Sequence, residues 1–265
     1  MLQIKIDKIV TPTVAENYEE RFVAFLDILG WRKQVEASKT DQSLIPKLGA
    51  VLAHLEITAD NPILRLLQFS QFSDCIIIST KASGLNHIQF LSAALGISRV
   101  LLYLGFLVRG GITRGLVYHN GSVAFGPALT KAYDLERLSV YPRIILDHDI
   151  ERLFLDSQNF TSNGRNCQFK WIRRAPDGFY FLDFLQSQNA QSIVGREEAA
   201  HGQKSAPLHF LRNIREMIAR NLRDHHDSRD IRTWEKYRWT AEYFNEIVLE
   251  YPEANVEMLN EVKWC

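Results

Sequence analysis

Two stretches, FVAFLDILGW at residues 22–31 and FSQFSDCIIIST at residues 69–80, decide which fold and which site this chain builds. Each is an apolar, strand-like run that carries one aspartate, Asp27 in the first and Asp74 in the second. A carboxylate beside a buried strand is costly unless a cation pairs with it. Two such carboxylates predict a divalent metal between them, and metals held by carboxylates usually serve phosphate chemistry.

The composition narrows the class of protein. The 265 residues include 31 Lys and Arg against 31 Asp and Glu, so the formal net charge is zero. This argues against a nucleic-acid binder that depends on a strong positive field. The three cysteines show no metal-ligand spacing, so we expect no disulfide framework and a reducing, cytoplasmic location.

We expect no signal peptide and no membrane span. The first residues, MLQIKIDKIVTPT, contain no apolar signal core. The longest apolar stretch, FLSAALGISRVLLYLGFLV at residues 90–108, carries Arg99 and two glycines. These features are typical of a buried helix that leads into a strand.

Periodicity and turn signals predict alternating helices and strands. In the first part of the chain we expect a strand 21–27 that ends at Asp27 and turns through Gly30, a helix 44–58, strands 63–69 and 75–80, and a helix 85–104. Beyond these we expect a strand 106–115, a hairpin 116–125 around Asn120-Gly121, a helix from Pro127, a strand 143–147, a helix 148–154 and a hairpin 167–184 around residues 176–178.

The order strand, helix, strand, strand, helix, strand predicts an α+β fold of the ferredoxin-like palm type. We expect this catalytic domain to cover residues 20–185, after an N-terminal extension of residues 1–19. The polar residues 186–204 read as a loop, and residues 205–265 as a helical C-terminal element.

Four motifs in this order resemble the catalytic domain of the class III nucleotidyl cyclases. They are FLDILG from residue 25, FSDCIIIS from residue 72, RGGITRG from residue 109 and FGPALTKAYDLE from residue 125. Within that family the chain most resembles the bacterial pyrimidine cyclases of the Pycsar antiphage system. The resemblance covers about residues 20–150 and implies a class III cyclase fold for the palm.

The resemblance also implies roles for individual residues. Asp27 and Asp74 would hold two Mg²⁺ or Mn²⁺ ions, with the backbone carbonyl of Ile28 completing the metal site. The triphosphate would meet Arg109 and the backbone amides of Leu29, Gly30 and Trp31.

The implied reaction is attack of the ribose 3′-hydroxyl on the α-phosphate of a nucleoside triphosphate, with release of pyrophosphate. UTP is the first expected substrate and CTP the second, and the product would be a 3′,5′-cyclic nucleotide. We expect a homodimer with active sites at its interface, and a separate effector protein that reads the cyclic nucleotide.

Some positions depart from the family pattern. Purine cyclases carry a base-reading lysine and aspartate where this chain has Ser70 and Val123, which disfavours a purine substrate. The asparagine and arginine that stabilise the family's transition state align with Thr130 and Asp134. A negative Asp134 cannot stabilise a developing phosphorane, so Lys131 or Arg137 would supply the charge.

Two other interpretations stay open. The palm could be a degenerate cyclase fold that senses a nucleotide and signals through its helical tail, which the changes at Thr130 and Asp134 favour. It could also be a palm-type nucleotidyltransferase that joins two nucleotides, although the motifs from residue 109 onward match cyclases better.

Overall fold

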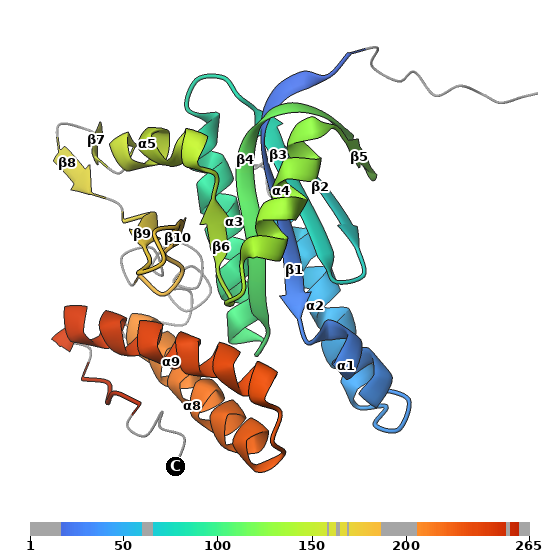
Figure 1. The fold of residues 1–265 in the computed structure, drawn as a ribbon, viewed down its shortest axis with the longest axis vertical. Helices are drawn as coiled ribbons and strands as arrows, with labels where there is room; N and C mark the ends of the chain where they lie inside the picture. Colours follow the sequence, from blue (N-terminus) through green and yellow to red (C-terminus); the bar gives the residue numbers. More distant parts are fainter. Residues whose placement is uncertain are drawn as a thin grey trace, which may run out of the picture.

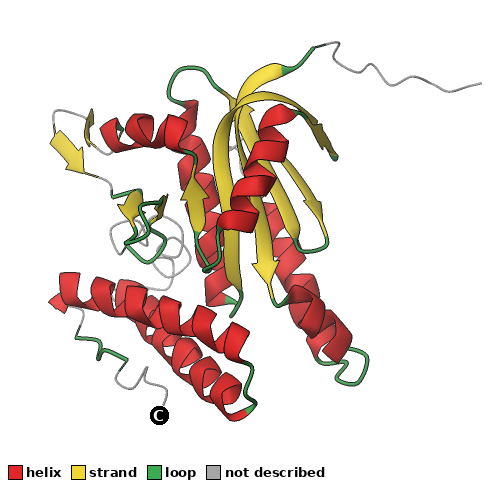
Figure 2. Cartoon of the chain, in the orientation of Figure 1, coloured by secondary structure: helices red, strands yellow, loops and turns green. Residues whose placement is uncertain are grey.

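The computed structural model describes residues 17–59, 66–157, 159–162, 165–168, 170–186, 206–252 and 255–259. The described residues form a mixed α+β structure with an eight-stranded sheet and a helical hairpin beside one end of it (Figures 1 and 2). The predicted fold class is therefore confirmed. The expected N-terminal extension and the expected loop at 186–204 lie mostly outside the described residues.

The first half of the chain has the ferredoxin-like topology that the sequence predicts. Its elements are β1 (Glu19–Leu29), α1 (Trp31–Ala37), α2 (Leu44–Ala59), β2 (Leu67–Phe72), β3 (Cys75–Lys81), α3 (Asn86–Tyr103) and β4 (Leu107–Asn120). The strands lie in the order β2-β3-β1-β4, and every neighbouring pair is antiparallel. This order puts β1, which carries Asp27, beside β3, which Asp74 immediately precedes.

The second half extends this sheet and adds the helical hairpin. It comprises β5 (Val123–Phe125), α4 (Pro127–Leu138), β6 (Ile144–Leu146), α5 (His148–Asp156), β7 (Asn159–Ser162), β8 (Arg165–Gln168), β9 (Ile172–Arg174), β10 (Tyr180–Leu182), α8 (Ala206–Asp227) and α9 (Ile231–Glu250). Strands β6, β10 and β9 continue the sheet beyond β4, while β7 and β8 form a separate hairpin.

Alternation along β1 sorts its side chains between two apolar layers. Leu26 and Ile28 are fully buried in the main core, which α3 covers, and this core continues into α8 and α9. Val23 and Phe25 belong to a smaller cluster under α4 on the other face. Figure 1 shows α4 in front of the sheet with α2 and α3 behind it. Asp27 follows Phe25 by two residues and so shares the α4 face.

The RGGITRG motif owes one of its glycines to the close approach of α4 to β4. A Cβ atom at Gly111 would lie 2.4 Å from Leu135 Cβ and 2.5 Å from the Ala132 carbonyl oxygen. Only glycine fits that space. Gly111 therefore fixes how near the acidic and basic residues of α4 come to the start of β4.

The structure corrects several predicted boundaries. The prediction that the first strand ends at Asp27 is wrong, because β1 pairs with β4 through Leu29. The second strand lies later than 63–69, at β2, because Phe72 pairs with Cys75 across a turn in which Ser73 has a φ of 56°. Strand β2 is at the edge of the sheet, where the polar residues Ser70 and Gln71 are tolerated.

Two predicted units of the second half are divided differently. The strand 106–115 and the first arm of the hairpin 116–125 are one strand, β4, which pairs with β1 and then with β5. The expected hairpin 167–184 begins too early, because β8 pairs with β7 and only β9 and β10 pair around residues 176–178.

Within the described ranges, no helix combines the length and the apolar character that a membrane crossing requires. In α3, which overlaps the longest apolar stretch of the sequence, Arg99 is 1% exposed. Its guanidinium donates to the carbonyl oxygens of Phe184 and Gln186, at 2.8 and 3.1 Å. This helix is therefore tied to the protein interior.

Candidate metal and nucleotide site

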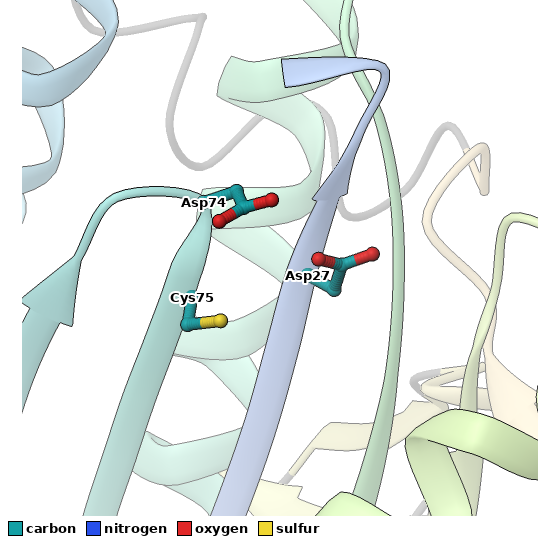
Figure 3. A group of neighbouring side chains, drawn as sticks. All are labelled: Asp27, Asp74 and Cys75. Atoms are coloured by element: carbon teal, nitrogen blue, oxygen red, sulfur yellow. The ribbon is translucent and has the colours of Figure 1, made fainter. Parts of the chain in front are cut away.

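The strand register brings one carboxylate, one thiol and one guanidinium group together on the α4 face of the sheet. Asp27 stands opposite Cys75 on β3 and opposite Arg109 on β4. Asp74 precedes β3, and its carbonyl oxygen accepts a hydrogen bond from the Ile28 amide at 2.9 Å. One possible ligand atom from each of Asp27, Asp74 and Cys75 lies within 4.8 Å of the others (Figure 3). The two predicted aspartates are thus brought together.

Asp27 is held in a costly environment. Burial raises the pKa of its carboxyl group, and the negative charge of Asp74 raises that pKa further. Arg109 opposes both effects, since its Nε donates to Asp27 Oδ2 at 3.1 Å. A divalent cation between the two carboxylates would relieve the same repulsion more strongly, because it carries two charges.

Arg109 also forms an ion pair with a second carboxylate, that of Glu136, which the sequence interpretation missed. Its Nε lies 2.5 Å from Glu136 Oε1, and the Glu136 side chain is only 4% exposed. Burial raises the pKa of Glu136, Asp27 raises it too, and Arg109 lowers it. Arg109, the predicted phosphate contact, is therefore also the cation that balances the charges of Asp27 and Glu136.

The donor set fits a hard divalent cation. Carboxylate oxygens are the ligands that Mg²⁺ and Mn²⁺ prefer. Burial, and then the charges of Asp74 and Asp27, raise the pKa of the Cys75 thiol to about 11. Cys75 therefore remains a neutral thiol near pH 7, and the ligands on offer are the oxygens of Asp27 and Asp74.

The turn after β1 has the backbone shape that the sequence predicts. Gly30 has a φ of 81° and immediately precedes α1. Trp31 is buried with its ring 5.8 Å from that of Phe106, which anchors the turn. Leu29 and Gly30 line a cleft between the palm and the α8–α9 hairpin. Phosphate binding by the amides of Leu29, Gly30 and Trp31 stays a prediction.

Ser70, a predicted base contact, belongs to a buried chain of hydrogen bonds. Its Oγ donates to the Gly121 carbonyl at 2.6 Å and lies 2.7 Å from His119 Nε2. His119 Nδ1 lies 2.8 Å from Ser79 Oγ, to which Arg21 Nε donates at 2.9 Å. Burial, and then the charge of Arg21, lower the pKa of His119 to about 4. Base reading by Ser70 would require these bonds to rearrange.

The other predicted site residues lie on β5 and α4. Val123 is 53% exposed and follows the β4–β5 turn. Thr130 is exposed, and its Oγ1 lies 3.4 Å from the Gly126 carbonyl oxygen. Lys131 forms ion pairs with Asp147 and Asp149. The catalytic roles of Thr130 and Lys131 and the base contact of Val123 stay predictions.

One residue that the sequence interpretation missed, Glu136, could have been found by closer attention to helix periodicity. Ala128, Ala132 and Glu136 recur at four-residue spacing, so they share the face of α4 that packs on the sheet. An acid on an otherwise apolar helix face signals a buried partner. Lys236, in the C-terminal element, carries no such signal, because nothing in its local sequence says what α9 faces.

Comparisons with known proteins add little to this geometry. No protein-family model matches the chain, and no curated protein matches it. Among solved structures, a class III adenylyl cyclase-like ATP-binding protein from Pseudomonas aeruginosa matches 49% of this chain, at 12% sequence identity and a TM-score of 0.37. The match spans 34% of that protein's own chain.

Proposed function

We propose that the protein is a metal-dependent nucleotidyl cyclase that converts a nucleoside triphosphate to its 3′,5′-cyclic monophosphate and pyrophosphate. The observation that carries this proposal is the meeting of Asp27, on β1, with Asp74, immediately before β3, in a ferredoxin-like palm. Two converging carboxylates with Arg109 beside them suit a metal-bound phosphate chain better than they suit a structural ion pair.

Asp27 and Asp74 would hold Mg²⁺ or Mn²⁺, with the Ile28 carbonyl as a further ligand. When bound, the ions supply acidification of the 3′-hydroxyl and neutralisation of charge on the leaving pyrophosphate. Arg109 holds Asp27 in place through its Nε and keeps the Glu136 charge balanced. Little covalent work remains for the side chains, so positioning and electrostatics dominate.

The finer parts of the proposal rest on the family motifs. Ser70 and Val123 stand where purine cyclases carry charged base-reading residues, which supports a pyrimidine nucleotide, with UTP first and CTP second. The product, cyclic UMP, would act as an antiphage messenger read by a separate effector. The protein would work as a homodimer in which both partners contribute residues to each active site.

The test is incubation of the purified protein with each of the four nucleoside triphosphates and Mn²⁺, followed by chromatography of the products. We expect pyrophosphate and cyclic UMP. Asp27→Ala and Asp74→Asn should abolish product while the oligomeric state stays unchanged. Asp156→Asn is the matched control, since Asp156 is 72% exposed and pairs only with Arg152 among the described residues. Full activity of either site variant would refute the metal assignment.

A nucleotide sensor is the second candidate. It is favoured by α4, where Asp134 is negative and Lys131 is already paired with Asp147 and Asp149. The same incubation separates the two candidates. A cyclic product supports the enzyme, whereas nucleotide binding without turnover of any of the four triphosphates supports the sensor.

A further inference from the structure

A cleft of about 900 Å³ separates one end of the palm from the α8–α9 hairpin. The palm side is formed by the turn at Gly30, by α1 and α2 and by the connection between α3 and β4. Six Lys and Arg side chains line it: Lys33, Lys47, Arg215, Arg220, Arg223 and Lys236. Glu216 is the one acid among its lining residues. We call it the basic cleft.

The charge in the basic cleft is largely uncompensated. Lys33 lies 3.4 Å from Asp230, and Arg215 lies 3.4 Å from Glu257. Each of the other four cations, Lys47, Arg220, Arg223 and Lys236, lacks an ion pair with any carboxylate that the structure describes. Like charges gathered on a concave wall repel one another unless an anion is bound between them.

The basic cleft adjoins the end of β1, the strand that carries Asp27. Leu29, which lines the cleft, shares a face of β1 with Asp27 because the two are two residues apart. Lys236 is half-buried on α9, and both Arg109 and Asp27 act on its charge. Burial, and then Arg109, lower the pKa of Lys236, while Asp27 raises it. The same lysine therefore lines the basic cleft and feels the charge of Asp27.

The size and charge of the basic cleft select the class of anion. A single phosphate would meet only a few of its cations, whereas a chain of phosphates can reach both walls. A nucleic-acid strand needs a positive track along the surface, but the chain as a whole has zero net charge and these six cations line a hollow.

We infer that the basic cleft binds the phosphate chain of the nucleotide, and that α8 and α9 thereby complete the site of their own chain. The inference rests on the proposed function for the identity of the nucleotide. It gives the C-terminal element a role in substrate binding, with Arg220, Arg223 and Lys236 as phosphate contacts. Arginine is suited to this role because its planar fork donates two hydrogen bonds to one phosphate.

The test uses inorganic tripolyphosphate as the probe, titrated calorimetrically into the full chain in the presence of Mg²⁺. The variants are Arg220→Gln with Arg223→Gln, and separately Lys236→Gln. Arg152→Gln with Arg212→Gln is the matched control, since both arginines are exposed and lie outside the cleft. Arg220 and Arg223 are exposed too, so we expect an unchanged melting temperature in either double variant.

We expect each cleft variant to weaken tripolyphosphate binding about tenfold, which is the value of one charge-assisted hydrogen bond, while the control binds as the wild type does. UTP should displace the probe, and the cleft variants should raise the KM for UTP more than they lower kcat. Unchanged tripolyphosphate affinity in both cleft variants would overturn the inference, as would failure of UTP to displace the probe.

The outcomes also separate the inference from the proposed function. Displacement of the probe by UTP together with weakened binding in the variants, but without any cyclic product, supports the basic cleft and refutes the cyclase. Formation of cyclic product with an unchanged KM in both cleft variants supports the cyclase and refutes the role of the basic cleft.

Discussion

Replacing Arg109 by Met should destabilise the protein strongly at neutral pH and weakly at acidic pH. The change leaves Glu136, whose side chain is 4% exposed, without the cation that now lies 2.5 Å from it. Glu136 then escapes ionisation by taking up a proton. From its ordinary pKa of 4.5, protonation costs about 3.4 kcal/mol at pH 7 and about 0.7 kcal/mol at pH 5.

The sign follows from linkage. In the variant, the pKa of Glu136 in the folded state rises further above its value in the unfolded state. The folded protein then binds the extra proton, and the penalty present above the folded pKa disappears as the pH falls toward 4.5. We expect a loss of about 3 kcal/mol in the free energy of unfolding at pH 7 and about 1 kcal/mol at pH 5.

Urea denaturation of wild type and variant at both pH values measures this difference. The double variant Arg109→Met with Glu136→Gln is the control, because glutamine cannot titrate, and it should lose most of the pH dependence. Some pH dependence should remain in the double variant, because the Asp27 side chain, which is 19% exposed, also loses its ion pair with Arg109. An equal loss for the single variant at pH 7 and pH 5 would refute the claim that Glu136 depends on Arg109.

Three further predictions concern other parts of the palm. Gly111→Ala should lower the free energy of unfolding by about 1–3 kcal/mol, because its Cβ would overlap α4. Thermal melting should show this loss for Gly111→Ala and no loss for the control Gly49→Ala, whose Cβ would lie in open space on α2. In a variant whose other cysteines are serine, the rate of alkylation of Cys75 should rise with pH, with a midpoint of about 11, and a midpoint near 9 would contradict this. Mn²⁺ should increase the rate, because it neutralises the carboxylates of Asp27 and Asp74. The His119 ring should titrate in NMR spectra with a midpoint of about 4, and a midpoint above 6 would refute this prediction. The free energy of unfolding should fall as the pH drops from 6.5 to 4, because in that range only the unfolded chain takes up this proton.

The fold could be predicted because its strands are marked by apolar runs and its turns by strong local signals. The Asn120-Gly121 turn and the helix start at Gly126-Pro127 are where the sequence places them. The second strand was misplaced because an edge strand need not be apolar, so β2 carries Ser70 and Gln71 where a central strand would carry aliphatic residues.

The site could be predicted only in part, for a different reason. Asp27 and Asp74 stand out because an acid in an apolar run is unusual, and the strand order brings them together. The four-residue spacing on α4 could have marked Glu136, but Lys236 sits in a helix rich in charge, where a cleft-facing residue looks like a solvated one. What such a residue faces is decided by packing between segments that are far apart in sequence, and no local pattern records it.

The ion pair between Lys33 and Asp230 joins residues 197 positions apart and links α1 to the start of α9. During synthesis the strands of the palm leave the ribosome long before α9 does, and N-terminal segments generally fold first. A nascent chain can therefore assemble its acid pair while the opposing cationic wall has yet to be translated. Arg215, Arg220 and Arg223 of the basic cleft lie on α8 and Lys236 lies on α9, so a message truncated ahead of α8 yields a chain that has only the palm wall of the cleft.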